Sequence, residues 1–365
     1  MFPVLGSGQT LEAQAIHVVI EAAGPTVPRA DTASMVELPD GRILIVYQKY
    51  ERGKDAGNDE GFCRIWSKTS RDNGHTWGEP WMLVDVAPGD LNIMNPMLLR
   101  LKSGDLLLAC HRNHPPHRNK VTEALFRSAD EGKTFVEEEP IWKRPPSYRI
   151  AIPPLNQLRS GRIVLAFAGR AGPRSKNFAI WCTLSDDDGR SWTESKGIIK
   201  LPKRGAMEPS VVELTDGTLV MSIRTQLGGP YLSRSTDAGE TWAEAKFSGL
   251  EGGESGTCLR RIPGTDDLLL FFNNSKYIPQ GHHHYGERSP LTAAISRDHG
   301  STWQIIGNLA SDPEAEYTNL NCLFTSKGTA IVTYMFAKPA WNRKKIDLRA
   351  AIVHLKWLSP KQQDR

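Results

Sequence analysis

The chain carries the stretch Ser70-Arg71-Asp72-Asn73-Gly74-His75-Thr76-Trp77, and four relatives of it follow at 128–135, 185–192, 235–242 and 296–303. The shared pattern is Ser-x-Asp-x-Gly-x-Thr/Ser-aromatic. It suits a tight hairpin turn, because the Asp carboxylate can accept backbone N–H groups and the Gly can adopt a positive φ without steric cost. The aromatic ring can then pack beside the next strand. Copies spaced roughly 50–60 residues apart indicate a repeat architecture.

A second repeat lies between these turns and predicts a hairpin in each unit. Residues 34–47 read as a strand, the turn Pro39-Asp40-Gly41 and a second strand. Equivalent hairpins are expected at 95–110, 152–167, 209–223, 256–272 and 318–334, each with a turn signal in its middle. The second arm of each is a nearly continuous apolar run, which is typical of a strand buried on both faces.

After each hairpin comes a longer loop and a third strand, which in five units runs into the Ser-x-Asp turn and a short fourth strand. Four antiparallel strands repeated six times predict an all-β fold, a six-bladed β-propeller that spans 1–365 as one domain. The sixth unit lacks the turn motif. We expect 348–355 as its third strand and the N-terminal run 15–20 as its fourth, which would close the ring. No segment predicts an amphipathic helix.

Composition and charge argue against some functions. The formal net charge is +4 and both signs are mixed along the chain, so no clustered basic face predicts a nucleic-acid partner. No apolar run approaches the roughly 20 residues that cross a bilayer, and the first ten residues have no signal-peptide pattern. We therefore expect no membrane span and, for the sequence as it stands, a cytoplasmic location. A trimmed export signal would leave the same start.

The cysteines indicate reduced thiols. Their number is odd, they lie far apart and mostly within apolar runs, and their spacing fits no metal site. They are Cys63, Cys110, Cys182, Cys258 and Cys322. We expect buried thiols in a reducing compartment, with neither a metal nor a cofactor.

The substrate site is expected at one mouth of the central channel. In a propeller, the loops between blades and those that join second and third strands converge there, whereas the Ser-x-Asp turns lie on the outer, opposite side. His111 and Arg112 follow the second strand of the second unit, so we expect both to contact substrate. Trp341 could stack on a sugar or cover the core, and the histidine-rich loop 282–285 could line the site.

The turn pattern is the Asp box, and nearly the whole chain resembles the sialidase superfamily, in particular the Asp-box sialidases. Segment 206–224 resembles the sialidase segment Asn-Glu-Ser-x-Val-Val-Glu-Leu-x-Asp-Gly followed by a strand that ends in Arg. That match implies that Glu208 is the catalytic glutamate and that Arg224 belongs to a carboxylate-binding arginine triad. Similar matches at 288–292 and 317–320 imply that Arg288 is another triad arginine and Tyr317 the nucleophile. Asp59 stands about where the family keeps its acid/base aspartate, counting back from the first box.

The implied chemistry suits an acidic sugar. A sialic acid carries a carboxylate on its anomeric carbon, and arginines can bind that group in a bidentate manner. The same carboxylate would repel a carboxylate nucleophile, whereas a neutral phenol avoids the repulsion, and sialidases use a tyrosine. The phenol needs a base, which would be Glu208, and Asp59 would protonate the leaving oxygen and later activate water. The resemblance thus implies a retaining exo-glycosidase that removes terminal sialic acid or a related 2-keto acid sugar from glycans.

The first repeat departs from the family pattern. Where sialidases have Tyr-Arg-Ile-Pro-Ser, this chain has Pro28-Arg29-Ala30-Asp31-Thr32-Ala33-Ser34, so Asp31 stands in the place of the first triad arginine. Arg29 is a substrate-binding candidate that reaches the site if the strand entry bulges. The family's Glu-x-Arg after the second strand is replaced by Gln48-Lys49-Tyr50. Two alternatives stay open: a hydrolase for another acidic glycan, and a glycan-binding propeller without catalysis.

Overall fold

The computed structural model describes residues 10–51, 57–116, 120–141, 149–150, 155–170, 175–279, 284–342 and 345–359. Within these ranges the chain forms strands β1 to β26 and two helices of four residues each, α1 (Leu11–Gln14) and α2 (Leu355–Leu358). Neither helix of this part of the chain is long and apolar enough to cross a membrane. The class is all-β, as expected.

Three sheets have the predicted plan of four antiparallel strands in chain order, and we call them units 2, 4 and 5. Unit 2 consists of β6 (Asn92–Arg100), β7 (Leu106–Asn113), β8 (Val121–Ser128) and β9 (Val136–Glu138). Unit 4 consists of β16 (Met207–Glu213), β17 (Leu219–Arg224), β18 (Tyr231–Ser235) and β19 (Lys246–Phe247). Unit 5 consists of β20 (Cys258–Arg261), β21 (Leu268–Asn273), β22 (Leu291–Ser296) and β23 (Gln304–Ala310).

Unit 3 follows the same plan with its first and fourth positions each shared by two short strands. β10 (Arg149–Ile150) and β11 (Asn156–Gln157) both pair with β12 (Ile163–Arg170). On the other side, β14 (Thr193–Glu194) and β15 (Ile199–Lys200) both pair with β13 (Phe178–Ser185).

Units 1 and 6 share one sheet. Unit 1 consists of β2 (Arg29–Glu37), β3 (Ile43–Tyr50), β4 (Cys63–Ser70) and β5 (Trp81–Val84). Unit 6 consists of β24 (Glu316–Phe324), β25 (Thr329–Ala337), β26 (Ile346–His354) and β1 (Ile16–Glu21), which runs antiparallel to β26. A single parallel pair, Arg29 with Ile346, joins β2 to β26. The N-terminal strand thus pairs where the sequence predicted it.

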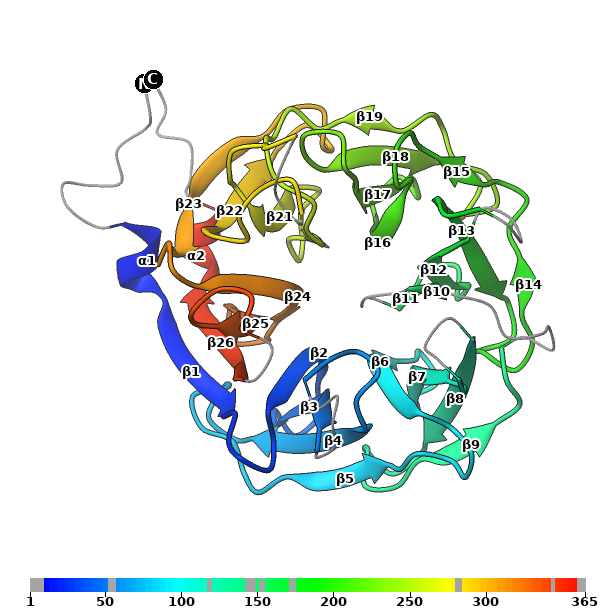
Figure 1. Ribbon diagram of the computed structural model, residues 1–365. Helices are drawn as coiled ribbons and strands as arrows, with labels where there is room; N and C mark the ends of the chain where they lie inside the picture. Colours follow the sequence, from blue (N-terminus) through cyan, green and yellow to red (C-terminus); the bar gives the residue numbers. More distant parts are fainter. Residues whose placement is uncertain are drawn as a thin grey trace.

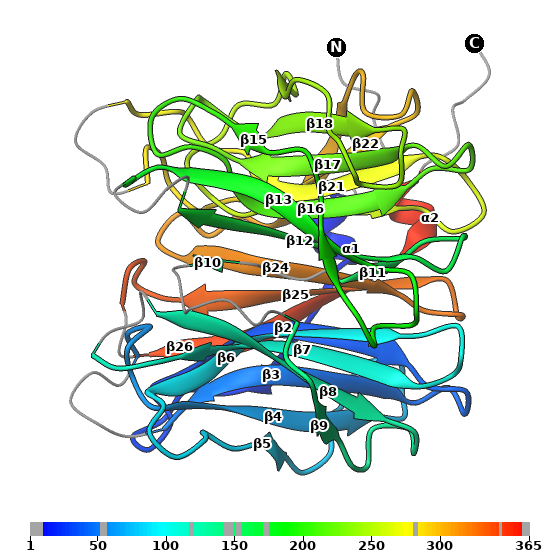
Figure 2. The same cartoon turned by 90° about the vertical axis from the view of Figure 1, so that its right-hand side faces the viewer.

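The units are arranged in a ring (Figure 1), which is the propeller-like arrangement. Early strands of the units, such as β2, β6, β16 and β24, lie nearest the centre, and later strands lie farther out. Seen from the side, most strands run in the direction of the ring axis (Figure 2). Residues that begin an inner strand can therefore converge on the axis from several units.

Hydrogen bonds and apolar side chains join neighbouring units. The Ser34 hydroxyl of unit 1 accepts the Leu98 N–H of unit 2 at 3.0 Å, and Asn321 of unit 6 donates to the Ala33 carbonyl of unit 1 at 2.7 Å. Apolar residues of adjacent sheets form shared core clusters, one of which spans units 1 and 2. Each fully buried Leu, Ile or Val contributes about 1.5–3 kcal/mol through its removal from water, so the ring is stabilised mainly between its sheets.

The five Ser-x-Asp turns have the same main hydrogen bonds. In the first, the Ser70 hydroxyl donates to Asp72 at 2.8 Å and accepts the Gly74 N–H at 2.9 Å, and the Thr76 N–H and hydroxyl donate to Asp72 at 2.8 and 2.6 Å. The other four copies repeat these contacts. Asn73 and Gly74 both have a positive φ, 62° and 89°. The turn prediction is confirmed, although only the glycine had a sequence signal.

The cysteines are buried and unpaired, as predicted. Burial raises the pKa of the Cys182 thiol to about 12. At neutral pH such a thiol is protonated and acts as a small core side chain.

Candidate functional site

Four inner strands bulge at the same place. The pairing register shifts between Asp31 and Ala33 in β2, and at matching points in β6, β16 and β24. The bulge residues Thr32, Asn95, Glu208 and Asn319 have φ values of 38°, 54°, 39° and 53°. A positive φ is uncommon for residues other than glycine, and such strained positions cluster at functional sites.

The bulges also share a spacing in the sequence. Each bulge residue stands nine positions before the glycine of its hairpin turn: Thr32 before Gly41, Asn95 before Gly104, Glu208 before Gly217 and Asn319 before Gly328. The position of Glu208 in unit 4 is therefore equivalent to that of Asn319 in unit 6.

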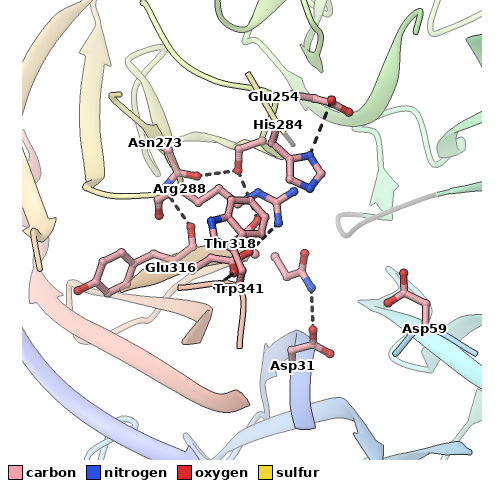
Figure 3. Close-up of polar contacts among 12 residues, drawn as sticks. Asp31, Asp59, Glu254, Asn273, His284, Arg288, Glu316, Thr318 and Trp341 are labelled. Carbon is pink, nitrogen blue, oxygen red and sulfur yellow. Dashed lines mark hydrogen bonds and ion pairs between the residues drawn. The ribbon is translucent and has the colours of Figure 1, made fainter. Parts of the chain in front are cut away.

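The four bulge side chains line one pocket of about 500 Å³ at the centre of the ring. In Figure 3, Asp31 and Asp59 lie on one side of the site, and His284, Arg288 and Trp341 on the other. The structure brings six of the eight predicted site residues to this pocket and leaves Tyr317 and Arg112 outside it. The six are Arg29, Asp59, His111, Glu208, Arg224 and Arg288.

Arg29 reaches the pocket but is paired with two carboxylates. Its guanidinium lies 2.8 Å from Asp31 and 2.7 Å from Asp59, and its Cζ is 4.5 Å from the centre of the Tyr50 ring. Burial alone would lower the pKa of Arg29, but the negative charge of Asp31, together with Tyr50 and Asp59, raises it well above its usual value. Two carboxyl groups therefore share one guanidinium at this corner of the pocket.

Arg224 holds Glu208 at the pocket wall. Its guanidinium donates to Glu208 at 2.6 Å and to Glu254 at 3.0 Å. Glu254 is fully buried and also pairs with Arg204 at 2.5 Å. Burial would raise the pKa of Glu254, but the contact with His284 and the charges of the two arginines lower it far below its usual range. A buried anion thus orients two arginines at this side of the pocket.

Arg288 is a buried cation with one carboxylate partner described, whereas Arg224 has two. It donates to Glu316 at 2.7 Å, and its guanidinium carbon lies 5.2 Å from the centre of the Trp341 ring. Burial, followed by the positive charge of Arg224, lowers the pKa of Arg288 to about 10. The Nε atoms of both arginines are buried and, within the described part of the chain, have no hydrogen-bond partner. Two such guanidiniums would be stabilised by an added anion.

His284 and Trp341 form a stacked pair above these arginines. Their ring centroids are 5.0 Å apart with an interplanar angle of 15°, and Arg224 contacts His284 Nδ1 at 3.3 Å. Burial first, and then the charges of Arg288 and Arg224, lower the pKa of His284 to about 4, so this ring is neutral at pH 7. The histidine-rich loop therefore brings His284 to the pocket, while 282 and 283 lie outside the described residues.

His111 and Arg112 lie on opposite faces of β7. His111 lines the pocket, where Asn95 lies 3.2 Å from its Nδ1. Arg112 does not line it and pairs instead with Glu137 at 2.6 Å. Because successive residues of a strand point to opposite faces, only one of the two can face the centre. The predicted contact of Arg112 with substrate stays a prediction.

Tyr317 lies outside the pocket lining, whereas the next residue of β24, Thr318, lines it. Its ring packs against Tyr334 and Phe336, with centroids 5.6 and 5.8 Å away, and the residue is only 4% exposed. Burial raises the pKa of the phenol. The side chain that unit 6 sends to the pocket from the bulge is Asn319.

Several polar residues of the site were missed from the sequence. The common spacing before the hairpin glycine would have found Thr32, Asn95 and Asn319. Glu254 had no signal, because it lies in a glycine-containing loop whose partners come from other segments. Among the residues that the structure describes, no three His, Cys, Asp or Glu side chains gather in a way that could hold a metal ion.

Comparison with models of known protein families gives a match for this chain. The profile of the BNR repeat-like domain matches residues 41–321. The chain belongs to this BNR repeat-like family. A comparison with curated proteins gives no match.

Solved structures with low sequence identity share the fold. A protein of unknown function from Dyadobacter fermentans superposes with a TM-score of 0.75 at 19% identity, over 95% of this chain and 98% of that one. The Trypanosoma rangeli sialidase in complex with sialic acid gives 0.71 at 14% identity, over 93% of this chain and 59% of that one. The leech intramolecular trans-sialidase gives 0.72 at 15% identity, over 94% and 71% of the two chains.

Proposed function

We propose that the central pocket binds the carboxylate of an acidic sugar, a sialic acid or a related 2-keto acid sugar, and hydrolyses its glycosidic bond. The observation that carries the proposal is the buried, under-compensated Arg288 beside a second buried arginine, Arg224. Burial of Arg224 is outweighed by Glu208 and Glu254, which raise the pKa of this arginine. By contrast, burial first, and then the repulsion by Arg224, lower the pKa of Arg288 to about 10. A bound carboxylate would remove that repulsion and could accept from both guanidinium forks.

The pocket also holds two carboxyl groups that can share the acid and base work. Glu208 lines the pocket and is held in place by Arg224 at 2.6 Å, so we assign it the role of the base. Asp59 and the fully buried Asp31 share the guanidinium of Arg29 as a partner. Asp31 accepts from donors on three sides, so we assign the transferable proton to Asp59, whose side chain is 38% exposed.

We assign the attack to water and not to Tyr317, whose ring lies outside the pocket. No tyrosine lines the pocket among the described residues. In the proposed step the water oxygen bonds to the anomeric carbon and gives its proton to Glu208. The glycosidic C–O bond breaks, and the leaving oxygen takes a proton from Asp59.

Direct attack by water predicts inversion at the anomeric carbon. Proton NMR recorded during the first turnovers should therefore detect the anomer opposite in configuration to the substrate, before mutarotation mixes the two. A first product that retains the configuration would instead require a covalent intermediate and would overturn the assignment of the attack to water.

Substitution of Arg288 tests the anion site. Arg288→Lys keeps the charge beside Glu316 but lacks the planar fork, so the affinity for free N-acetylneuraminic acid should fall about 10–100-fold. Isothermal titration with this sugar, a second 2-keto acid sugar and glucuronic acid measures the effect, and galactose is the neutral control. Arg260→Lys is the matched variant, because Arg260 lines a separate cavity of about 170 Å³.

Equal affinity for acidic and neutral sugars, or an unchanged affinity in Arg288→Lys, would overturn the proposed anion site. Turnover of umbelliferyl glycosides of the same sugars then separates the hydrolase from a second candidate, a glycan-binding propeller without catalysis. Asn319 occupies the position of unit 6 that is equivalent to Glu208 of unit 4, and the lack of a carboxylate there favours this second candidate. The binding propeller predicts tight binding with no release of the aglycone.

We further infer that units 1 to 6 are the six blades of a propeller whose ring is closed by β1. Each unit has four strand positions, and β1 occupies the fourth position of unit 6. The buried, unpaired cysteines support a reducing compartment such as the cytoplasm.

A further inference from the structure

The bulge of unit 6 presents an amide to the pocket at the position where unit 4 presents a carboxylate. Asn319 and Glu208 have the same distance to their hairpin glycines, similar positive φ values and a place in the same pocket lining. A carboxamide neither accepts a proton readily near neutral pH nor acts as a nucleophile at carbon. Its use in a pocket is to donate and accept hydrogen bonds in a fixed direction.

Asp31 sets that direction. The Asn319 Nδ2 donates to the Asp31 carboxylate at 2.8 Å. An ionised carboxylate only accepts, so the nitrogen of the amide must face Asp31 and the oxygen must face away. Asp31 is fully buried and is itself held by Arg29 at 2.8 Å. The amide of Asn319 is therefore oriented by a rigid anion and not by solvent.

The oxygen of Asn319 is left available. Within the described part of the chain it has no hydrogen-bond partner, and the residue is only partly buried. Asp31 acts in the same way on Gln48, whose nitrogen donates to it while the Gln48 oxygen accepts the backbone N–H of Asn95 at 2.8 Å. One buried carboxylate thus orients side chains of units 6 and 1 and, through Gln48, supports the bulge of unit 2.

We propose that Asn319 is a specificity-determining residue whose side-chain oxygen accepts a hydrogen bond from a hydroxyl or acylamino N–H of the bound sugar, with Asp31 as its positioning residue. The proposal rests on the function proposed above, because it takes the ligand to be the acidic sugar held by Arg224 and Arg288. The substrate then needs a donor group on the side of the sugar ring that faces Asn319.

A cycle that changes both the protein and the ligand tests this. The wild type and Asn319→Leu, which is close in size but has no acceptor, are titrated with N-acetylneuraminic acid. They are then titrated with its deoxy analogues and with the analogue that carries a hydroxyl in place of the acylamino group. For one analogue the wild type should lose about tenfold in affinity, and Asn319→Leu should show the same loss with the parent sugar but no further loss with that analogue.

Gln157→Leu is the matched control, because Gln157 also donates to an aspartate, Asp188 at 3.2 Å, but does not line the pocket. It should bind every ligand like the wild type. If Asn319→Leu weakens all ligands by one common factor, the residue is structural and the inference is overturned. The same holds if Asn319→Leu changes nothing. If the wild type binds no acidic sugar at all, it is the proposed function that fails.

Discussion

The Ser-x-Asp turns and the inner-strand bulges both recur along the chain, but the turns repeat backbone and side chains, whereas the bulges repeat only the backbone. Each of the five turns keeps its backbone and its side chains, and so its hydrogen bonds. The four bulges keep only the backbone, and their side chains are a hydroxyl, two amides and one carboxylate. The conserved geometry supports the ring, whereas the varied side chains build a pocket with a different group on each wall. Substitutions in the turns should therefore change the stability of the fold, whereas substitutions at the bulges should change catalysis.

The largest expected effect comes from the one carboxylate among the bulges. Glu208→Gln keeps the size of the side chain and the strained backbone but removes the base, so kcat should fall about 10²–10⁴-fold. The melting temperature should stay close to that of the wild type, because Arg224 keeps Glu254 as a partner. Steady-state kinetics with a glycoside that the wild type cleaves, together with calorimetry, give both numbers.

Glu138→Gln is the control for that experiment, since Glu138 also pairs with an arginine, Arg127 at 2.5 Å, but does not line the pocket. Its kcat should equal that of the wild type. A kcat for Glu208→Gln within tenfold of the wild-type value would remove the base from the proposed mechanism and would place the chemistry elsewhere in the pocket.

The same contrast explains what the sequence predicts well. A Ser-x-Asp turn is local: the serine, aspartate and glycine that bond to one another lie within four residues, so the pattern alone specifies the contacts. The hairpins are local in the same sense. Their order along the chain led directly to the sheet units and to the pairing of β1 with β26.

The site is harder to predict because its partners come from different units. Glu254 pairs with arginines that lie 50 and 30 residues before it, and nothing in the sequence marks it as their anion. Arg112 was expected at the pocket because it follows an apolar run. A strand buried on both faces, however, has no polar alternation to show which residue faces the centre. In unit 6 the family resemblance implies Tyr317, whereas the spacing to the hairpin glycine identifies Asn319 as the residue at the bulge.

The smallest expected effect lies in the turns, and it should appear in stability alone. The hydrogen bonds from Thr134, first through its hydroxyl and then through its N–H, hold the pKa of Asp130 at about 2, below its usual value near 4. A carboxyl whose pKa is lower in the folded state stabilises the fold above its unfolded pKa, and this contribution disappears as the pH falls through the folded pKa. Asp130→Asn should therefore lower the melting temperature by roughly 1–4 °C at pH 7, and the difference from the wild type should shrink between pH 4 and pH 2. Calorimetry at several pH values measures it, with kcat at 25 °C as the second readout. A loss of kcat at an unchanged melting temperature would break the separation between turns and pocket, because an outer turn would then be acting on the chemistry.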